Sequence, residues 1–458
     1  MRRRVPVRIL GAAAVLFGGA LSYTDTDTAH VLAALVALVV SAHAFGFIFA
    51  RFRQPPVIGE IVGGLVLGPT LLERLWPAGQ HWLFPDTGPT PAVLGVVYQL
   101  GLLLLMFAAG AQVRGLVNRA AARTVSAIAV TGLALPFLGG LGVFALIDLT
   151  RFEGTAHDRT SLLLVFAIAI AVTSIPVISR IMLDLGLLET RFARIVLSVA
   201  VIEDVVLYVV LAVAVGMVAG IGTAQFGLAG VLGWDPGSAA NDAYHSVATV
   251  AFLAVGLAFG PRIYGRLQGS RFNLVHRRSQ VGFQLVVMIG MSGACLLLSI
   301  VPLFGAFVAG IVVASTPGER AETARTEIGA FALGLFIPVY FAIIGLQLDL
   351  VSNLEIAFFL AFLGFACIAK AGSVYLGARI AGERRSEAVS LAIAMNARGG
   401  PGIVLASTAY GAGIIDARFY TTLVMLAIVT SLIAGAWLAR TVASTQPAAD
   451  PADALALG

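Results

Sequence analysis

Residues 198–208 read SVAVIEDVVLY and place two adjacent acids, Glu203 and Asp204, inside an apolar segment that we predict to be a helix at 190–218. A segment of this length can cross the hydrocarbon core of a bilayer. A charged side chain at the bilayer centre costs about 2.5–3.5 kcal/mol, so such a residue needs a reason to be there. Neighbouring residues of a helix point about 100° apart. We therefore expect one carboxylate to face a water-filled cavity and the other a neighbouring helix; the alternative is a buried structural pair.

The composition of the whole chain extends this interpretation. Of its 458 residues, 59% are hydrophobic and 12% charged, and the mean hydropathy is +0.96. Ordinary soluble chains carry about twice that charged fraction. A water-soluble enzyme, a disordered chain and a fibrous repeat are therefore excluded. The alternating pattern of a membrane β-barrel is absent, so we predict an all-α polytopic membrane protein.

The connections between apolar segments alternate in charge. Arginine-rich loops alternate with acidic or sparsely charged ones, and basic loops stay cytoplasmic. The scattered arginines orient a membrane protein and do not indicate nucleic acid, despite the net charge of +5. We predict a multi-pass protein of the inner cell membrane with both termini, including the C-terminus, in the cytoplasm. The fourteen expected spans are 7–23, 30–50, 57–73, 92–112, 124–149, 161–183, 190–218, 243–260, 279–300, 301–317, 326–348, 355–381, 387–413 and 416–440.

The two ends of the chain differ from the rest. Residues 1–29 hold an extra N-terminal span, for which a cleaved signal peptide is the alternative. Residues 441–458 are expected to be a disordered tail, with no soluble regulatory domain. The two cysteines, Cys295 and Cys367, show neither a disulfide framework nor a metal spacing.

The only lysine in the chain, Lys370, lies inside an expected span. Its position, nine residues before Arg379, gives it a depth similar to that of Asp204. A desolvated lysine can release its proton, whereas arginine cannot. The use of lysine at this one position favours an amine that titrates, and a fixed counter-ion is the alternative.

Two expected helices carry sequences that should interrupt them. Residues 172–176 read VTSIP, and residues 398–402 read RGGPG. Interrupted helices in corresponding positions of two halves indicate a transporter site. Freed carbonyls and the hydroxyls of Thr173 and Ser174 are oxygen ligands suited to a small cation, and Arg398 could compensate the facing half-helix ends. Simple proline kinks are the alternative.

The positions of these interruptions indicate an inverted repeat. Residues 124–218 and 355–440 each form a unit of three spans with the interrupted helix in the middle. The two units enter the membrane from opposite sides. Glu60, near the cytoplasmic end of its own span, is as well explained by packing or gating as by ion binding.

Several stretches together resemble the second family of monovalent cation:proton antiporters, over about residues 30–440. The family includes bacterial sodium/proton antiporters, Kef-type potassium/proton systems and plant cation/proton exchangers. The matching stretches are RQPPVIGE at 53–60 through Gly68-Pro69, TSIPVISR at 173–180, GLLET at 186–190 with SVA at 198–200 and the following acids, FGAF at 304–307, FAIIGL at 341–346 and NARG at 396–399.

The resemblance implies thirteen helices, a dimerisation domain and a mobile core in which two interrupted helices cross beside an acidic pair. It implies that Asp204 is the ion-binding aspartate and that Lys370 pairs with the preceding acid, as in electrogenic members. The chain departs from the family in having Glu-Asp at the pair, Gly110-Ala111-Gln112 where Gly-Leu-Glu is frequent, and an extra first span. The absence of a nucleotide-binding domain is unlike a full Kef-type system.

These observations predict a secondary antiporter, and not an enzyme, that exchanges protons for a monovalent cation, with Na⁺ preferred. Cation and proton would compete for Asp204, with Thr173 and Ser174 completing the cation shell and Glu203 paired with Lys370. No cofactor is expected, and the protein should work as a homodimer in the lipid bilayer. The alternatives are a K⁺/H⁺ or broad cation exchanger, and a sodium-coupled organic anion transporter in which Lys370 and Arg398 bind the anion.

Overall fold

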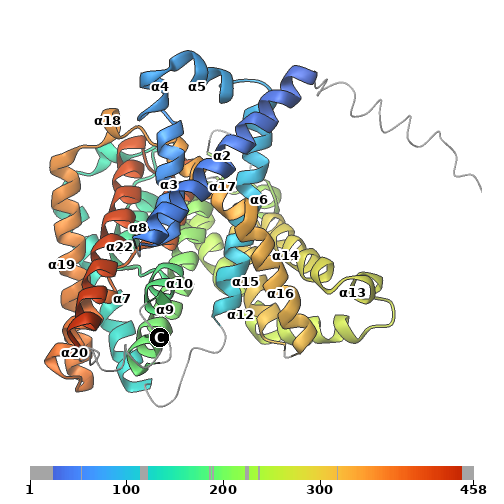
Figure 1. Ribbon diagram of the computed structural model, residues 1–458. Helices are drawn as coiled ribbons and strands as arrows, with labels where there is room; N and C mark the ends of the chain where they lie inside the picture. The colour runs from blue at the N-terminus through green and yellow to red at the C-terminus, as the bar shows by residue number, and fades with distance from the viewer. Residues whose placement is uncertain are drawn as a thin grey trace, which may run out of the picture.

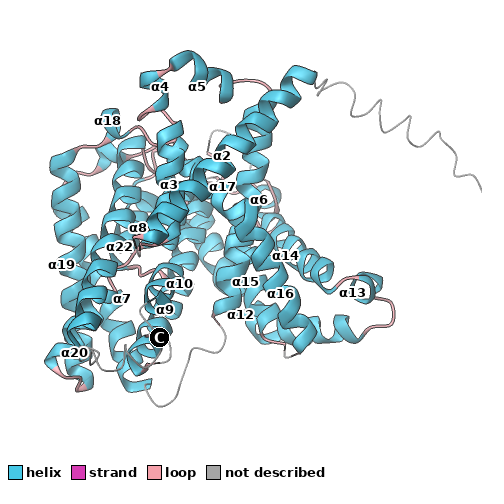
Figure 2. Ribbon diagram, in the orientation of Figure 1, coloured by secondary structure: helices cyan, strands magenta, loops and turns pink. Residues whose placement is uncertain are grey.

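The computed structural model describes residues 24–445, except 53, 114–121, 185–186, 188–189, 222–225, 236–237 and 317. The expected first span at 7–23 and the chain after residue 445 lie outside the described residues. The described part is helical throughout, and its only bridge of strand type joins Glu153 to Ile415 (Figure 2). Eleven of these helices are long and apolar enough to cross a membrane, and α8 (Arg159–Ala171) and α15 (Pro302–Ala314) are shorter apolar helices.

One group of helices, the core bundle, lies on the left of Figure 1 and contains both predicted units. Helix α7 packs against α19 and α8, and α21 packs against α22. The helices of the core bundle are α7 (Ala122–Leu146), α8, α9 (Ile175–Asp184), α10 (Arg191–Val218), α19 (Ile356–Ala381), α20 (Arg385–Ala394), α21 (Gly399–Gly411) and α22 (Ala417–Thr445).

The other group, the scaffold bundle, occupies the middle and right of Figure 1. Its main helices are α2 (Asp25–Arg51), α3 (Pro56–Leu67), α6 (Pro89–Gln112), α12 (Ala239–Gly269), α14 (Gln280–Leu297), α15, α16 (Glu319–Phe331) and α17 (Ile337–Leu346). A π-helical turn, η3 (Ala332–Phe336), makes α16 and α17 one continuous span. The short connecting helices are α4 (Leu72–Leu75), α5 (Pro77–Leu83), η2 (Thr150–Phe152), α11 (Leu228–Leu232), α13 (Leu274–Arg278) and α18 (Leu350–Asn353).

Glycines hold the scaffold bundle together by allowing backbones to touch. A Cβ atom on Gly64 would lie 1.8 Å from the Ala342 carbonyl oxygen, so α3 and α17 cross closer than any side chain permits. Helices α6 and α15 do the same reciprocally, with Gly110 against Phe307 and Gly310 against Phe107. Close approach through small residues is how membrane helices gain packing energy without a hydrophobic driving force.

Both predicted interruptions are present, but each lies just before its proline. Helix α8 ends at Ala171 and α9 begins at Ile175, so Pro176 is in the first turn of α9. Helix α20 ends at Ala394 and α21 begins at Gly399, so Pro401 is in the first turn of α21. Proline is tolerated there because the first-turn N–H groups have no intrahelical partner.

The expected span boundaries differ from the structure in further places: α12 extends to Gly269, beyond the expected end at 260, and the span expected from 326 begins at Glu319. The span at 57–73 is divided into α3 and α4, and α22 continues to Thr445, beyond the expected end at 440. Backbone hydrogen bonds connect the ends of the two units: the N–H of Gly154 donates to Ile414 (3.0 Å), and that of Ala156 to Gly413 (2.9 Å). These contacts bind the connections α7–α8 and α21–α22 together.

Candidate ion-binding site

The acid pair lies in the middle of α10, inside the core bundle. Thr190 caps this helix by accepting a hydrogen bond from the Ala193 N–H (3.1 Å), and 28 residues of mainly apolar sequence follow. Glu203 is 0% exposed and Asp204 is 1% exposed. The pair is therefore fully removed from the surface, although both residue types are strongly hydrophilic.

Glu203 faces a neighbouring helix and forms an ion pair. Its Oε1 accepts a hydrogen bond from Lys370 Nζ of α19 at 2.6 Å, and both side chains are 0% exposed. Lys370 Nζ also donates to the carbonyls of Gly132 on α7, at 3.0 Å, and of Ala171 on α8. All three ammonium protons thus have acceptors. Since Ala171 is the last residue of α8, the cation also lies at the negative end of that half-helix.

Asp204 has no such partner. Neither of its carboxylate oxygens accepts a hydrogen bond from any residue that the structure describes. Burying an ionised carboxylate without a partner is strongly unfavourable. A positive charge, a proton or a cation, is the species that would neutralise this group. The arrangement can therefore hold one monovalent charge at Asp204.

A further buried oxygen lies one helical turn beyond Asp204. The Tyr208 hydroxyl is buried and without a hydrogen-bond partner among the described residues, and its ring packs against Phe307 of α15 with centroids 4.7 Å apart. Tyr208 is not among the site residues expected from the sequence. Its i,i+4 spacing from Asp204, which puts two side chains on one side of a helix, was the available signal.

Arg398 precedes α21 and is 1% exposed. It donates to the carbonyl oxygens of Ala169 (3.3 Å) and Ile170 (3.1 Å) in the last turn of α8, and to that of Ala366 (2.8 Å) on α19. It also reaches the backbone and side-chain oxygens of Asn396, both at 3.2 Å, a contact that sequence reasoning missed. Carbonyls that the end of a helix leaves unpaired are thus satisfied by a cation.

Thr173 and Ser174 form the crossing point of the two interruptions. The Thr173 hydroxyl donates to the Met395 carbonyl (2.5 Å), and the Ser174 N–H donates to the Ala397 carbonyl (2.6 Å). The Ser174 hydroxyl oxygen accepts from the Val177 N–H at 3.4 Å. Both side chains are 0% exposed. Each hydroxyl oxygen retains a lone pair, so each can still act as a ligand.

Glu60 belongs to the scaffold bundle and is apart from these residues. It is 9% exposed on α3, and its side chain lies beside Gly46 of α2, where a Cβ would be 3.5 Å from its Cγ. Its Oε2 has no hydrogen-bond partner within the described ranges. The structure therefore brings together Glu203, Lys370, Arg398, Thr173 and Ser174 around the crossing helices, and places Glu60 at a scaffold crossing.

The fold and the sequence both have known relatives. The sodium proton antiporter MjNhaP1 from Methanocaldococcus jannaschii superposes with a TM-score of 0.65 over 92% of this chain and 99% of its own, at 15% identity. Cation/H(+) antiporter 20 from Arabidopsis thaliana is 29% identical over 413 residues, which are 87% of this chain and 47% of the relative. Na(+)/H(+) antiporter NhaS4 from Synechocystis sp. is 28% identical over 417 residues, covering 89% and 96%.

This chain spans about half the length of the plant relative and nearly all of the cyanobacterial one. The family described as "Sodium/hydrogen exchanger, transmembrane" matches residues 31–444. This match confirms the resemblance found in the sequence, and the relatives are transporters rather than enzymes. The chain is therefore a multi-pass membrane protein that belongs to the family of monovalent cation:proton antiporters.

Proposed function

We propose that the protein is a secondary antiporter that exchanges protons for a monovalent cation, with Na⁺ as the cation, by alternating access. One observation carries the proposal: Asp204 is buried with both carboxylate oxygens unpartnered among the described residues, whereas the adjacent Glu203 already has a cation at 2.6 Å. A buried carboxylate with one uncompensated charge accepts a proton or a monovalent cation, but not both. Competition at one site is the simplest way to couple the two fluxes.

The cation shell is proposed to include Asp204, the hydroxyls of Thr173 and Ser174, and backbone carbonyls of the interrupted helices. Residues 172–174 lie between α8 and α9, and Val172 is extended, so its carbonyl is directed away from the helical ladder of α8, whereas the Ser174 carbonyl accepts from the Ile178 N–H of α9 at 3.2 Å. Oxygen donors of this kind suit hard cations. Asp204 and Thr173 would contact the transported ion directly.

The Glu203–Lys370 pair is proposed to respond to ion binding at Asp204. Its two charges balance each other, and the three acceptors around Lys370 Nζ fix its position. If Lys370 releases its proton as the cation binds, one turnover moves two protons per cation and transport is electrogenic. If it keeps the proton, only Asp204 exchanges and transport is electroneutral.

Alternating access is proposed to move the core bundle, about residues 124–218 and 355–440, against the rest as a scaffold. In support of this division, the core units are joined to each other at the crossing point and through backbone bonds at one end. We further propose a homodimer in the cell membrane, with the C-terminus in the cytoplasm because arginine-rich connections alternate along the sequence with acidic or sparsely charged ones.

The hydrogen bonds of the two buried basic side chains disfavour the organic anion alternative. Lys370 and Arg398 donate to carbonyl oxygens and to Glu203, and these bonds occupy the three ammonium protons and most of the guanidinium. An anion would have to displace several of them.

The test is dye-quench transport with purified protein in proteoliposomes, given pulses of Na⁺, K⁺ and Li⁺ at several pH values. We expect a proton flux opposite to the cation flux, with the apparent cation affinity falling as pH falls. Proton flux that no monovalent cation elicits would contradict the proposal. A response to K⁺ equal to or larger than that to Na⁺ would select the K⁺/H⁺ or broad exchanger instead.

A further inference from the structure

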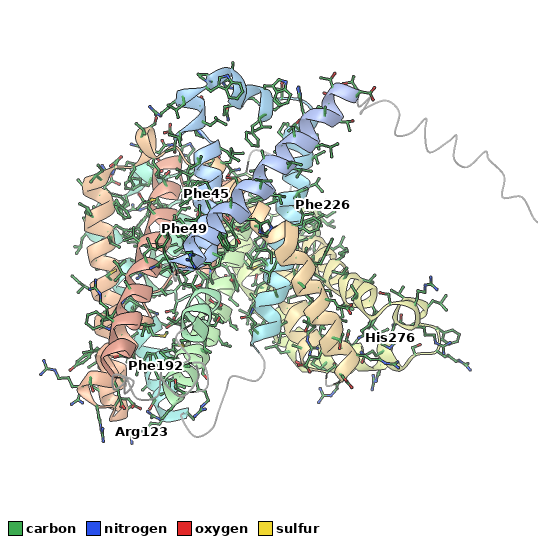
Figure 3. All side chains as sticks on the ribbon, viewed as in Figure 1. Phe45, Phe49, Arg123, Phe192, Phe226 and His276 are labelled. Atoms are coloured by element: carbon green, nitrogen blue, oxygen red, sulfur yellow. The ribbon has the colours of Figure 1, made fainter. Side chains whose placement is uncertain are left out.

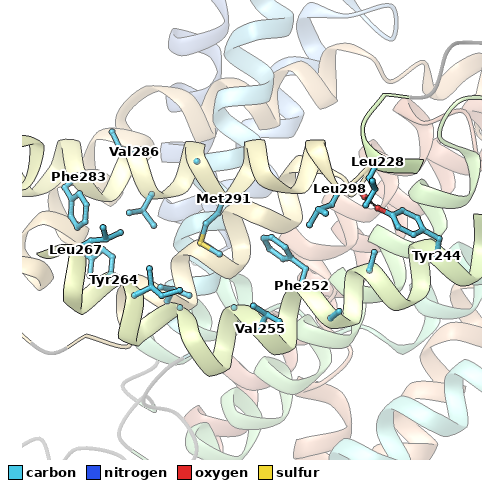
Figure 4. A pocket seen from close by; sticks show the side chains of 18 residues that line it. Leu228, Tyr244, Phe252, Val255, Tyr264, Leu267, Phe283, Val286, Met291 and Leu298 are labelled. Carbon is cyan, nitrogen blue, oxygen red and sulfur yellow. Dashed lines mark hydrogen bonds between the residues drawn. The ribbon is translucent and has the colours of Figure 1, made fainter. Parts of the chain in front are cut away.

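An apolar groove runs between α12 and α14, away from the acid pair. Its volume is about 640 Å³, and Figure 4 shows side chains of both helices, including Phe252, Tyr264 and Met291, pointing into it. On α12 it extends from Tyr244 to Leu267, which is roughly 35 Å of helix and close to the thickness of the hydrocarbon core. The groove thus has the length and the polarity of the bilayer interior.

Glycines shape the groove on both of its sides. On α12, a Cβ on Gly256 would lie 2.6 Å from the side chain of Val308, and a Cβ on Gly260 would lie 2.5 Å from that of Val312. These glycines therefore allow α12 to pack closely against α15. Gly290 of α14 borders the groove, and no atom of the described residues lies within 4 Å of its Cβ position. Because glycine has no side chain, the groove is open at the level of Gly290.

A cluster of exposed arginines stands at one end of the groove, where α12 gives way to α13 and α14. Figure 3 shows side chains at this end, around His276, directed away from the helices. Residues 262–280 contain no acidic residue. Glu319 and Glu327 of α16 lie beside Gln280, at a separate hollow. The members of this arginine cluster are Arg262, Arg266, Arg271, Arg277 and Arg278.

We propose that the groove binds an anionic phospholipid, with an acyl chain between α12 and α14 and the phosphate on the arginine cluster. Clusters of four to eight basic residues beside a transmembrane helix attract acidic lipids. A second copy of this chain is the less favoured occupant, because a two-fold interface sets the same patch of each copy face to face. Two arginine clusters would then repel each other.

Occupancy of the groove is connected by packing to the ion-binding helix. The other end of α12 lies against α10: a Cβ on Gly216 would be 2.4 Å from His245 Nδ1, and Asn241 Nδ2 donates to the Met217 carbonyl at 3.4 Å. A lipid that fixes the position of α12 therefore also supports the C-terminal end of α10. This coupling rests on the proposed function, whereas lipid binding itself does not.

The test is native mass spectrometry of the purified full chain in detergent, titrated with palmitoyl-oleoyl phosphatidylglycerol or with the phosphatidylcholine of the same acyl chains. We expect phosphatidylglycerol to bind preferentially. Replacing Arg277 and Arg278 together with glutamine should weaken it about fivefold per arginine, the factor that corresponds to about 1 kcal/mol. The matched control is the exposed pair Arg384 and Arg385 of the core bundle, replaced in the same way, which should bind normally.

A second pair of variants tests the groove itself. Gly290→Leu should fill it and lower the affinity for both lipids, while Gly293→Leu, on the same helix but outside the groove, should not. Equal binding of the two lipids by the wild-type protein would overturn the proposal. So would phosphatidylglycerol binding that survives Gly290→Leu, or a Gly290→Leu protein that keeps its lipid and loses only its dimer, which would identify a second copy as the occupant.

Discussion

At the scale of single residues, two adjacent carboxylates of nearly identical chemistry have opposite environments. A rotation of about 100° along α10 points Glu203 at Lys370 and leaves Asp204 without a partner among the described residues. If aspartate stood at 203 and glutamate at 204, the aspartate would face Lys370 and the glutamate would be the acid without a partner. Lys370 is also distinguished by its surroundings, since three acceptors on three other helices surround its ammonium group.

Asp204→Asn should abolish exchange, because the amide can neither bind a proton at working pH nor balance a cation. The variant should still insert and fold, since Asp204 makes no hydrogen bond within the described structure. Proton flux in proteoliposomes measures the loss, and Glu327→Gln, an exposed carboxylate on α16, is the matched control. Exchange by Asp204→Asn at near the wild-type rate would refute the role of this residue.

Lys370→Arg should make exchange insensitive to an imposed membrane potential, because arginine keeps the charge but cannot release the proton. Some exchange should survive if Asp204 still binds ion and proton alternately. The measurement is initial flux in proteoliposomes with valinomycin-imposed potentials of both signs. Wild-type protein whose rate ignores the potential would contradict the two-proton scheme and leave Glu203–Lys370 as a structural pair.

At the scale of elements, the half-helix ends and the connections between helices carry the polar contacts. At the crossing point, Thr173 bonds to the end of α20. At the arginine-rich end, Glu383 between α19 and α20 accepts hydrogen bonds from Arg191 of α10 (2.8 and 2.6 Å) and from Thr124 of α7 (2.6 Å). These bonds connect the two predicted units.

Thr173→Val should raise the apparent KM for the cation while changing proton release less, because it removes one oxygen ligand and keeps the branched shape. Loss of the bond to Met395 should also lower stability by about 1 kcal/mol. Thr421→Val is the control, since that buried hydroxyl bonds only within its own helix, to Ala417. An unchanged KM in Thr173→Val would exclude its hydroxyl as a ligand.

The Glu383 contacts should stabilise the protein in a pH-dependent way. Hydrogen bonds from the Arg191 guanidinium, and then from Thr124, lower the pKa of Glu383 to about 2. A carboxylate whose pKa is depressed on folding stabilises above its unfolded pKa of about 4.3, and that contribution disappears as pH falls toward the folded value. Glu383→Gln should therefore have a lower Tm than wild type at pH 7, and the difference should shrink between about pH 4 and pH 2. A constant difference in Tm over this range would show that the charge is not what stabilises.

At the scale of the whole molecule, buried hydrogen bonds connect the scaffold bundle to the core bundle, and two of them involve α17. The hydroxyls of Tyr340 on α17 and Ser407 on α21 are 2.9 Å apart, and the Tyr420 hydroxyl of α22 donates to the Ile344 carbonyl of α17 at 3.1 Å. Any movement of one bundle against the other has to break these bonds. They therefore favour the conformation described here.

Tyr340→Phe should weaken that conformation by about 1 kcal/mol, a change of about fivefold in the conformational equilibrium. Hydrogen–deuterium exchange should show faster amide exchange in α21, and the apparent cation KM should shift on one side of the membrane more than on the other. The control is Tyr410→Phe, because Tyr410 lies in α21 and is 38% exposed. This variant should leave amide exchange in α21 and the cation KM unchanged. Identical exchange in Tyr340→Phe and wild type would show that this bond does not hold the bundles together.

The sequence by itself determined the family and the course of the helices, because hydropathy and loop charge are local properties. Every expected span that falls on described residues has a helical counterpart. The interruptions were also predictable, since proline and glycine disfavour a helix interior, although Pro401 and the glycines beside it are accommodated in the first turn of α21. Each break lies on the N-terminal side of its proline, because proline is accepted in the first turn of the helix that follows.

The tertiary structure shows how the polar residues are paired. The family resemblance implied that Lys370 pairs with Glu203, but the two residues are 167 apart and no local pattern of this chain states which of two adjacent acids faces α19. The same holds for Arg398, whose carbonyl partners belong to α8 and α19, and for the unpartnered Tyr208. Such pairings depend on the rotation and crossing of whole helices, which are set by contacts such as Gly64 against Ala342, and those contacts arise only when distant segments pack.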